Sequence, residues 1–479
     1  MPRVSLVKKL LTSFCFLFAI NATQGNAYPH NESIAQGINY YLSRIDPKTH
    51  IGIVVQSMNS GRVLYSKNAN DFFEPASVQK LFTVASALIA LSPNFHFDTN
   101  LLTTGRISDG VLHGNLIFKF SGDPTLKQSD IAEFVKKIKS MGINDITGNV
   151  IIDNTAYNHV PYPAGWVWSD LSLDFAAPLD TVIINRNQFG ISLIPERVGE
   201  KPRIEPHLPA GAATFYNEML TTRYPTRNCP ITFFSNQHGQ YVIKGCLAKS
   251  SGPQARSLAI RNMEMYTRAL IRVLLVKNNI QFHGAMYAAK TPVNATLLYE
   301  HQSASLSHII IHLLKRSDNL YADTLLKKMG EHYAHGSGSW QDGLRAMRPI
   351  LSQEAGVNLS NVHLIDGAGL SRYNLVTPNA VSAILCYIDH NRVLRETLIP
   401  ALPIAGVDGT LAWRMPNLAK GHRLHAKTGS MDGVSTLAGF VKTENQGVLS
   451  FVIMANNVPK NRAPCLSLEN HIAEYLART

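Results

Sequence analysis

The sequence predicts an α+β fold in which a β-rich insertion interrupts one antiparallel sheet that carries packed helices. The first part of the chain reads as a helix, two strands and a buried helix, and the last part reads as three successive strands and a helix. Between them, residues 99–257 alternate short strand-like segments with turns rich in proline and glycine. We therefore expect the two opening and three closing strands to complete a single five-stranded sheet around the insertion.

The opening elements are marked by apolar periodicity and by turn residues. Residues 34–45 repeat apolar positions at helical spacing, and residues 51–68 read as a hairpin that turns at an Asn-Ser-Gly tripeptide. The next helix begins after Pro75 and continues to about Leu91, through an almost wholly apolar run. These elements form the first part of the interrupted domain, residues 28–98.

The later elements place the second part of that domain at residues 258–479. One helix at about 128–141 interrupts the inserted strands, and strong helical periodicity resumes only from about residue 258. Three strands near the end of the chain precede a final helix at about 465–477.

The N-terminal segment has the features of a secretory signal peptide. Arg3, Lys8 and Lys9 precede a short apolar stretch, and small residues allow cleavage after Ala27. The apolar stretch is shorter than the ~20 residues that span a bilayer comfortably. We expect residues 1–27 to direct export to the periplasm, with an uncleaved membrane anchor as the alternative.

The charge of the chain limits the partners that it can have. The formal net charge is +12 at pH 7, which favours cell-wall polymers or anionic headgroups at a membrane surface. The lysine and arginine residues are scattered and form no basic stripe with interleaved aromatic residues. The sequence therefore argues against nucleic-acid binding.

The cysteines predict one disulfide and no zinc site. Cys229 and Cys246 flank two strand-like runs around a His-Gly turn, and export would allow them to pair. Cys386 and Cys465 lie in apolar helical patterns and are expected to be buried thiols. The chain has no Cys-x-x-Cys pattern, and we expect no cofactor or metal.

A serine and a lysine three residues apart stand at the start of the apolar helix, in "SVQK". Residues i and i+3 share a helix face, so the Lys80 amine can reach the Ser77 hydroxyl. A half-buried lysine can lose its proton near neutral pH and act as a base. The same spacing also occurs by chance at Ser5 and Lys8, so the pair alone does not establish a nucleophile.

Two further short motifs supply the other parts of a serine acyl-transfer site. Ser317 and Asn319 lie in a break between two buried helices, where a hydroxyl and an amide can project together. Lys427-Thr428-Gly429 enters a strand near the end of the chain, and a lysine beside a threonine hydroxyl suits a carboxylate. Gly429 would allow a ligand to approach the backbone closely.

In this order the three motifs resemble the active-site signature of penicillin-binding proteins and serine β-lactamases. The long insertion and the stretches "SGDPTL", "SDNLYADTLL", "DGAGLSRYNLVTP" and "AGVDGTL" resemble the class C low-molecular-mass penicillin-binding proteins. Members of that family are D-alanyl-D-alanine carboxypeptidases and endopeptidases. Departures from the family pattern, at Ser121, Asp318 and Ala368, remove no catalytic group.

The resemblance implies a role for each motif residue in an exported enzyme that acts on peptidoglycan. Ser77 would attack the carbonyl of the penultimate D-alanine, Lys80 would take its proton, and Ser317 would relay a proton to the departing amine. Penicillin and other β-lactam antibiotics would acylate the same serine.

The remaining motif residues would bind the substrate. Asn319 would hold the substrate amide, while Lys427, Thr428 and Ser430 would bind a carboxylate. The N–H groups of Ser77 and Ser430 would form the oxyanion hole.

The insertion is expected to recognise the stem peptide. In the family, an acidic residue of the insertion meets the free amino group of diaminopimelate, and the stretch "GWVWSDLSLDFAAP" points to Asp170 with Phe175 as an apolar neighbour. Arg372 would pair with the carboxylate of that side chain. Alternatively, Asp170 caps a turn and Arg372 is a surface residue. Asp432 has no assigned role.

Other pairs of polar or aromatic residues can be explained without a catalytic role. His308 and His312 have the i, i+4 spacing of metal ligands but lack the glutamate of a metalloprotease motif, so we expect ordinary histidines. Asp123 and Asp366 lie in glycine-containing turns and are expected to be turn-formers. The tryptophans of "GWVWSD" fit either a core cluster or the wall of a binding site.

Two alternative functions remain open at this point. A serine β-lactamase would use the same acylation followed by fast hydrolysis, although the sequence shows no acidic loop for the hydrolytic water and the insertion argues against it. A non-catalytic cell-wall-binding protein of the same fold would not require the complete set of three motifs.

Overall fold

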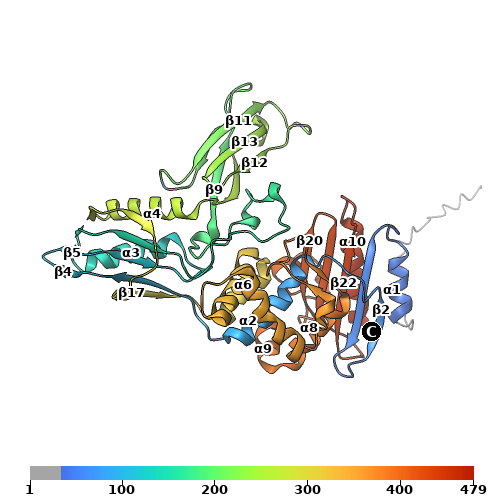
Figure 1. Ribbon diagram of the computed structural model, residues 1–479. Helices are drawn as coiled ribbons and strands as arrows, with labels where there is room; N and C mark the ends of the chain where they lie inside the picture. The colour runs from blue at the N-terminus through green and yellow to red at the C-terminus, as the bar shows by residue number, and fades with distance from the viewer. Residues whose placement is uncertain (1–33) are drawn as a thin grey trace, which may run out of the picture.

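The computed structural model describes residues 34–479, which form two regions of different architecture (Figure 1). The sheet region comprises residues 34–97 and 303–479, and the inserted region comprises residues 98–302. The expected signal peptide lies outside the described residues. Within residues 34–479, none of the helices combines the length and the apolar character needed to cross a membrane.

A five-stranded antiparallel sheet forms the centre of the sheet region, as the sequence predicts. Its strand order is β2-β1-β22-β21-β20, so the two ends of the chain meet where β1 pairs with β22. The strands are β1 (His50–Ser57), β2 (Val63–Lys67), β20 (Leu424–Met431), β21 (Val434–Lys442) and β22 (Val448–Asn456). Strand β20 lies at an edge of the sheet.

Helices cover both faces of this sheet because successive side chains of a strand point to opposite faces. In β22, Phe451 and Ile453 enter the core beneath α1 (Ile34–Leu42) and α10 (Ala463–Arg478), whereas Val452 and Met454 enter the core on the other face.

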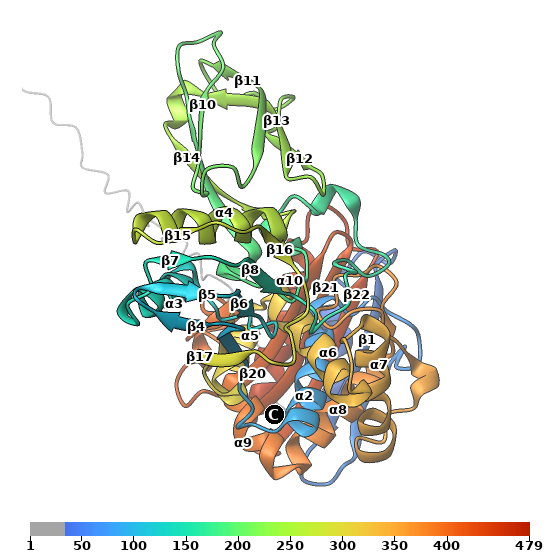
Figure 2. The same ribbon diagram turned by 60° about the vertical axis from the view of Figure 1, so that its left-hand side comes forward.

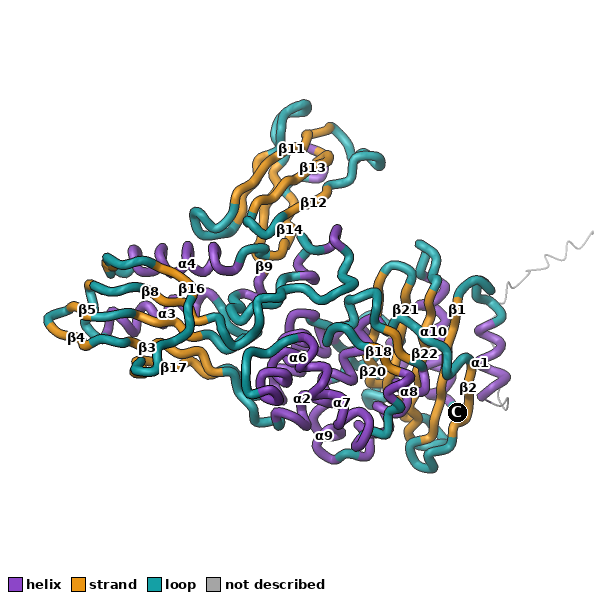
Figure 3. Tube along the Cα trace, in the orientation of Figure 1, coloured by secondary structure: helices purple, strands orange, loops and turns teal. Residues whose placement is uncertain are grey.

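Helices α2, α6, α7 and α9 lie between that second face and the inserted region (Figure 3). The helices that share this core are α2 (Lys80–Leu91), α5 (Leu306–Arg316), α6 (Asn319–Ala334), α7 (Trp340–Pro349), α8 (Pro378–His390) and α9 (Arg392–Ala401). A short two-stranded sheet, β18 (Val362–His363) with β19 (Leu375–Val376), flanks the stretch "DGAGLSRYN".

The inserted region contains four small sheets around one shared apolar core. A five-stranded and a four-stranded sheet pack with α3 (Gln128–Ser140) and α4 (Met263–Lys277), and strands β10 to β14 extend beyond α4 (Figure 2). The strands of the first two sheets are β3 (Asp98–Thr103), β4 (Arg106–Ser108), β5 (Val111–His113), β6 (Leu116–Lys119), β7 (Asp145–Ile146), β8 (Val150–Asp153), β15 (Gln281–Phe282), β16 (Met286–Ala288) and β17 (Thr296–Gln302). The two three-stranded sheets contain β9 (Gln188–Ile194), β10 (Arg203–Pro206), β11 (Thr214–Thr222), β12 (Thr232–Ser235), β13 (Gln240–Ala248) and β14 (Gln254–Ala259).

The predicted end of the insertion at residue 257 was too early. Helix α4 was expected to belong to the second part of the interrupted domain, but Leu270 and Ile271 pack into the core of the inserted region. Strand β17 then returns antiparallel to β3, so the chain leaves the inserted region beside the point where it entered. Helical periodicity identifies α4 but does not reveal which sheet covers its apolar face.

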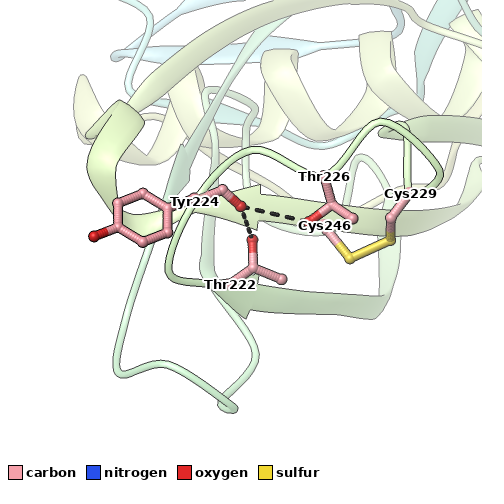
Figure 4. Close-up of a disulfide and its surroundings, with 5 residues drawn as sticks. All are labelled: Thr222, Tyr224, Thr226, Cys229 and Cys246. Carbon is pink, nitrogen blue, oxygen red and sulfur yellow. Dashed lines mark hydrogen bonds between the residues drawn. A yellow bond between two sulfur atoms is a disulfide. The ribbon is translucent and has the colours of Figure 1, made fainter.

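The predicted disulfide between Cys229 and Cys246 is present in the inserted region (Figure 4). It links the segment before β12 to β13, and these two strands form the expected antiparallel hairpin. Of the other two described cysteines, Cys465 is a buried thiol in α10 and Cys386 is a half-buried thiol in α8.

Candidate active site

Ser77 and Lys80 form a hydrogen-bonded pair at the entrance to α2. Ser77 lies in a 3-10 turn, Ala76–Gln79, that leads into the α-helix, and the Nζ atom of Lys80 is 2.8 Å from the Ser77 Oγ atom. The lysine is fully buried and also donates to Asn319 Oδ1 and the carbonyl of Ala368, each at 2.7 Å. Burial lowers the pKa of Lys80 to about 8, although nearby carboxylates, Asp323 first, oppose the shift. A substantial fraction of this amine can therefore be neutral near physiological pH and accept the serine proton.

The backbone before Ser77 is held in a sparsely populated conformation. Ala76 has a φ of +45°, in the left-handed region that a residue with a Cβ rarely occupies. Thr436 Oγ1 donates to the Pro75 carbonyl at 3.0 Å, which ties this turn to β21. Such local strain persists only where surrounding contacts determine it, and here they fix the direction of the Ser77 side chain.

Position 429 requires a glycine for a structural reason that the sequence did not suggest. A Cβ at this position would lie 2.2 Å from Thr436 Oγ1 and 2.9 Å from the Pro75 carbonyl oxygen. The protein's own Pro75–Ala76 turn and Thr436 thus occupy the space that a side chain at position 429 would take, and the approach of a ligand to the Gly429 backbone stays a prediction. The glycine allows β20 to lie directly beside the residue that precedes Ser77.

Ser317 and Asn319 lie in the break between α5 and α6, as predicted. Ser317 adopts a left-handed conformation with a φ of +57°, and its Oγ accepts from Lys427 Nζ at 2.8 Å. Asn319 accepts from Lys80 and donates from Nδ2 to the carbonyl of Phe175 at 2.8 Å. The break therefore connects the motifs of α2, α6 and β20.

The motif on β20 completes the arrangement. Lys427 is fully buried, and burial followed by the nearby Lys80 lowers its pKa well below the ordinary value. Thr428 Oγ1 donates to Thr410 Oγ1 at 2.7 Å, and the Ser430 hydroxyl accepts from Arg462. Because β20 is an edge strand, its outer backbone groups near Thr428 can receive an extended peptide.

A family model described as the D-Ala-D-Ala carboxypeptidase 3 (S13) family matches residues 35–478. The chain belongs to this family. The expected relationship to penicillin-binding proteins is thereby confirmed, and the relatives below agree with it.

Two curated relatives match most of the S13 peptidase chain. The D-alanyl-D-alanine carboxypeptidase DacB of Haemophilus influenzae is 32% identical over 440 residues, which cover 89% of this chain and 91% of the relative. The D-alanyl-D-alanine carboxypeptidase of an Actinomadura species is 29% identical over 446 residues, 89% of this chain and 81% of that one.

Solved structures confirm the predicted fold class. The crystal structure of penicillin-binding protein 4 (dacB) from H. influenzae aligns with a TM-score of 0.86 at 31% identity, covering 92% of this chain and 99% of that chain. A structure of the same protein complexed with a β-lactam aligns with a TM-score of 0.81 at 29% identity, with coverages of 92% and 100%.

Two buried aspartates, Asp323 and Asp366, accept N–H groups of the loop whose Ala368 carbonyl receives Lys80. Asp323 Oδ1 accepts the N–H groups of Gly367 and Ala368 at 2.8 and 3.0 Å, which fixes the Ala368 carbonyl that receives Lys80. Burial and the neighbouring Asp366 raise the pKa of Asp323 well above its ordinary value. Sequence reasoning did not single out Asp323, although its position one helical turn after Asn319 on a largely apolar helix was a usable signal.

Asp366 is a turn-former, as expected, and it also links the two regions. Its carboxylate accepts the N–H groups of Gly369 and Ser371 at 2.7 Å each. It also accepts Trp166 Nε1 at 2.9 Å, so this tryptophan of the inserted region belongs to the support of the site. The other tryptophan of the pair, Trp168, has 72% of its surface exposed and stacks on Phe234.

Of the three residues predicted to recognise a diaminopimelate side chain, Asp170 and Arg372 lie within electrostatic reach of each other. Burial raises the pKa of Asp170; the nearby Asp432 acts in the same direction, and the nearby Arg372 opposes it. Arg372 Nη1 pairs with Glu74 Oε2 at 2.9 Å, a partner that sequence reasoning missed. Phe175 contributes its carbonyl to Asn319 and leaves its ring partly exposed.

The remaining predicted polar residues have structural partners. Asp123 accepts from the N–H and hydroxyl groups of Thr125, as expected of a turn-former. His308 lies 2.8 Å from the Ser305 hydroxyl, and His312 lies 3.2 Å from Asp318. Across residues 34–479, no group of three or more His, Cys, Asp or Glu side chains could hold a metal ion.

Proposed function

We propose that this S13 peptidase is a serine D-alanyl-D-alanine carboxypeptidase that acts through an acyl-enzyme on Ser77. The observation that carries the proposal is the 2.8 Å contact between Lys80 Nζ and Ser77 Oγ, made by a buried amine whose pKa is lowered to about 8. Membership in the S13 family and the carboxypeptidases among its relatives support the same reaction.

Acylation begins when the neutral Lys80 amine accepts the proton of the Ser77 hydroxyl. The alkoxide attacks the carbonyl of the penultimate D-alanine, and the predicted oxyanion hole, the N–H groups of Ser77 and Ser430, stabilises the tetrahedral oxyanion. Collapse of this intermediate breaks the peptide bond and leaves the substrate acyl group on Ser77. The left-handed turn at Ala76 favours this step because it fixes the nucleophile before substrate arrives.

The leaving amine needs a proton, and Ser317 is suited to deliver it. Its hydroxyl already accepts a hydrogen bond from Lys427 Nζ, so it can pass its own proton forward to the amine and be resupplied from the lysine. After the amine leaves, Lys80 loses to solvent the proton that it took from Ser77, and Lys427 regains one from solvent. The neutral Lys80 then accepts a proton from the water that attacks the acyl-enzyme and passes it to the departing Ser77 oxygen, which restores the hydroxyl.

The terminal carboxylate of the substrate is proposed to bind at Lys427 and Thr428. An incoming carboxylate would favour the charged form of the buried Lys427 and offset its desolvation. The edge position of β20 supports an extended peptide backbone alongside the same residues.

Finer features of the substrate and its location are also proposed. Asp170, Arg372 and the ring of Phe175 would recognise the diaminopimelate side chain of a peptidoglycan stem peptide, with Glu74 releasing or sharing Arg372 when a carboxylate enters. Cleavage of cross-links, as an endopeptidase, would use the same site. Export to the periplasm is supported by the N-terminal sequence, and the net charge of +12 favours contact with cell-wall polymers.

Labelling with a fluorescent penicillin tests the nucleophile. The Ser77→Ala variant should lose all labelling while keeping the wild-type thermal unfolding temperature, because Ser77 is one small side chain at the start of a packed helix. Mass spectrometry of the labelled wild-type protein should place the adduct on the peptide that contains Ser77. Labelling that survives in Ser77→Ala would exclude this serine.

The lifetime of the adduct separates a carboxypeptidase from a β-lactamase. We expect the penicilloyl adduct to persist in a mass-spectrometric time course, since Asp323 Oδ1 and the carboxylate of Asp366, two buried groups that interact with Lys80, already accept backbone N–H groups. Turnover of the adduct within seconds would favour a β-lactamase.

A further inference from the structure

Asp318 lies between Ser317 and Asn319 in the break between α5 and α6. A side chain of the inserted region contacts it. Arg186 Nη1 lies 3.1 Å from Asp318 Oδ2, and His312 Nε2 lies 3.2 Å from the same oxygen. The Asp318 side chain is only 4% exposed, whereas that of Arg186 is 44% exposed. Burial disfavours the Asp318 carboxylate, but the bonds from His312 and Arg186 outweigh burial and lower its pKa.

The turn that carries Arg186 has an uncommon backbone. Asn185, Arg186 and Asn187 have φ values of +51°, +59° and +54°, so three successive residues with side chains occupy the left-handed region. Asparagine tolerates this region but arginine rarely adopts it, so Arg186 keeps such a conformation only when surrounding contacts impose it. Strain of this kind clusters at functional positions.

Contacts within the inserted region impose this turn. The N–H of Asn185 donates to the Leu126 carbonyl at 2.9 Å. Asn187 is fully buried; its Oδ1 accepts the N–H of Ile184 at 3.0 Å and its Nδ2 donates to the Pro178 carbonyl at 3.0 Å. The flanking asparagines therefore anchor the turn to the core of the inserted region, and Arg186 between them points to Asp318.

A displacement of Asp318 would affect both of its chain neighbours. Ser317 before it accepts from Lys427, and Asn319 after it accepts from Lys80. Asp318 also caps α6, since its side chain accepts from the N–H of Tyr321. One carboxylate thus fixes the start of α6 and the spacing between the Ser317 hydroxyl and the Asn319 amide.

We propose that Arg186 is a positioning residue, through which the inserted region holds Asp318 and sets the geometry of Ser317 and Asn319. The inference rests on the proposed acylation of Ser77, because its effect is measured as the rate of that step. The inserted region then contributes to the rate on every substrate, in addition to any role in recognising one side chain.

The test compares four variants by their second-order rate of acylation with a fluorescent penicillin. Arg186→Gln removes the charge and is expected to fold, because the side chain faces a pocket of about 780 Å³ rather than the apolar core. Asp318→Asn keeps a side chain that can cap a helix and removes only the carboxylate charge. Arg186→Lys and the Arg186→Gln, Asp318→Asn double variant complete the set, with Arg268→Gln, an exposed salt-bridge arginine of α4, as the matched control.

We expect Arg186→Gln and Asp318→Asn each to slow acylation roughly threefold to tenfold, in the lower part of the range of coupling energies found for residues in contact. The double variant should be no slower than Asp318→Asn, Arg186→Lys should recover part of the rate, and Arg268→Gln should match wild type. The same loss should appear with a peptide substrate, because the geometry of Ser317 and Asn319 serves both.

Two results would overturn the inference. A wild-type acylation rate in Arg186→Gln would show that the contact does not position the site. Losses that add in the double variant and follow the drop in unfolding temperature would show general destabilisation instead. In either case the proposed function stands if the wild-type protein is labelled at Ser77 and the Ser77→Ala variant is not labelled.

Discussion

The sheet region and the inserted region differ in where they bury charge. The sheet region places two fully buried lysines, Lys80 and Lys427, and two buried aspartates around a single serine. The inserted region buries Asp123 and Asp153, but in its own turns, where Thr125 and Thr155 donate to them. Its polar contacts with the site are the Phe175 carbonyl, Trp166 Nε1 and the Arg186 guanidinium. Burying a charge is costly unless partners compensate it, so such groups gather where chemistry uses them.

The two regions are therefore expected to contribute differently to the reaction at Ser77. Removing one of the buried charged groups around Ser77 should impair every reaction at this serine. Removing a contact of the inserted region should change the rate only partly, or for only one class of substrate.

Replacement of Lys80 should have the largest effect. Loss of a general base typically costs a factor of 10² to 10⁴, so Lys80→Ala should slow penicillin acylation on the order of 10³-fold. In the wild type only the neutral amine is a base, so the acylation rate should rise with pH, reach half its maximum at about 8 and then level off. A stopped-flow pH series measures both quantities.

Lys327 offers a matched control for this pH profile. It is another buried lysine whose pKa burial lowers to about 8, but it donates to Asn158 and Val160 and lies against the Trp340 ring. Lys327→Met should reduce stability and leave the midpoint of the acylation profile unchanged. A shifted midpoint in this variant would mean that a group other than Lys80 controls the profile.

Replacement of Asp323 should have an intermediate effect. Asp323→Ala leaves the N–H groups of Gly367 and Ala368 without their acceptor, at a cost of roughly 1–3 kcal/mol in the free energy of unfolding. The Ala368 carbonyl should then hold Lys80 less well, and acylation should slow. Asp323→Asn retains an oxygen acceptor and should remain close to wild type in a urea titration. Equal losses in both variants would contradict a hydrogen-bonding role.

Much of the fold could be predicted because its signals are local. Period-two and helical patterns located the strands of the five-stranded sheet and the helix that follows Ser77, and the i, i+3 spacing brought Lys80 to Ser77. The end of the inserted region could not be located in the same way. The periodicity of α4 is equally consistent with packing on either region.

The parts of the site that escaped prediction depend on contacts between distant segments. Gly429 is required because Pro75 approaches it, which no spacing within "KTG" reveals. Arg186 lies between two asparagines, residues that tolerate the left-handed region, but the sequence does not show that Asp318 is its partner. Glu74 precedes Pro75 and pairs with Arg372, and the sequence did not indicate this pairing either.

Replacement of Asp170 should affect one substrate class only. If its carboxylate binds the free amine of diaminopimelate, Asp170→Ala should slow cleavage of such peptides roughly tenfold, the change that follows from losing about 1.4 kcal/mol of a charged hydrogen bond. Penicillin acylation should stay unchanged, as should both rates in Glu218→Gln, an exposed acidic control on β11. Parallel losses on peptide and penicillin would indicate structural damage, and no loss on either would remove Asp170 from the site.

Removal of the disulfide should have the smallest effect on catalysis. Cys229 and Cys246 are separated by 17 residues, and a cross-link of that length stabilises by about 3 kcal/mol in the chain-entropy model. Replacing both by serine should lower the unfolding temperature of the inserted region and leave penicillin acylation at the wild-type rate.

The same double replacement can reveal how far the disulfide-bonded sheet influences the site. Strand β12 contacts the loop of Asp170 through Phe234, which stacks on Trp168, and through Ser235, whose hydroxyl lies 2.8 Å from that of Ser172. If this loop recognises the stem peptide, loosening β12 should produce a small loss in peptide cleavage with no loss in penicillin acylation. A matching loss in penicillin acylation would show that the stability of the inserted region affects the reaction at Ser77 directly. The two regions would then be less independent than their buried charges suggest.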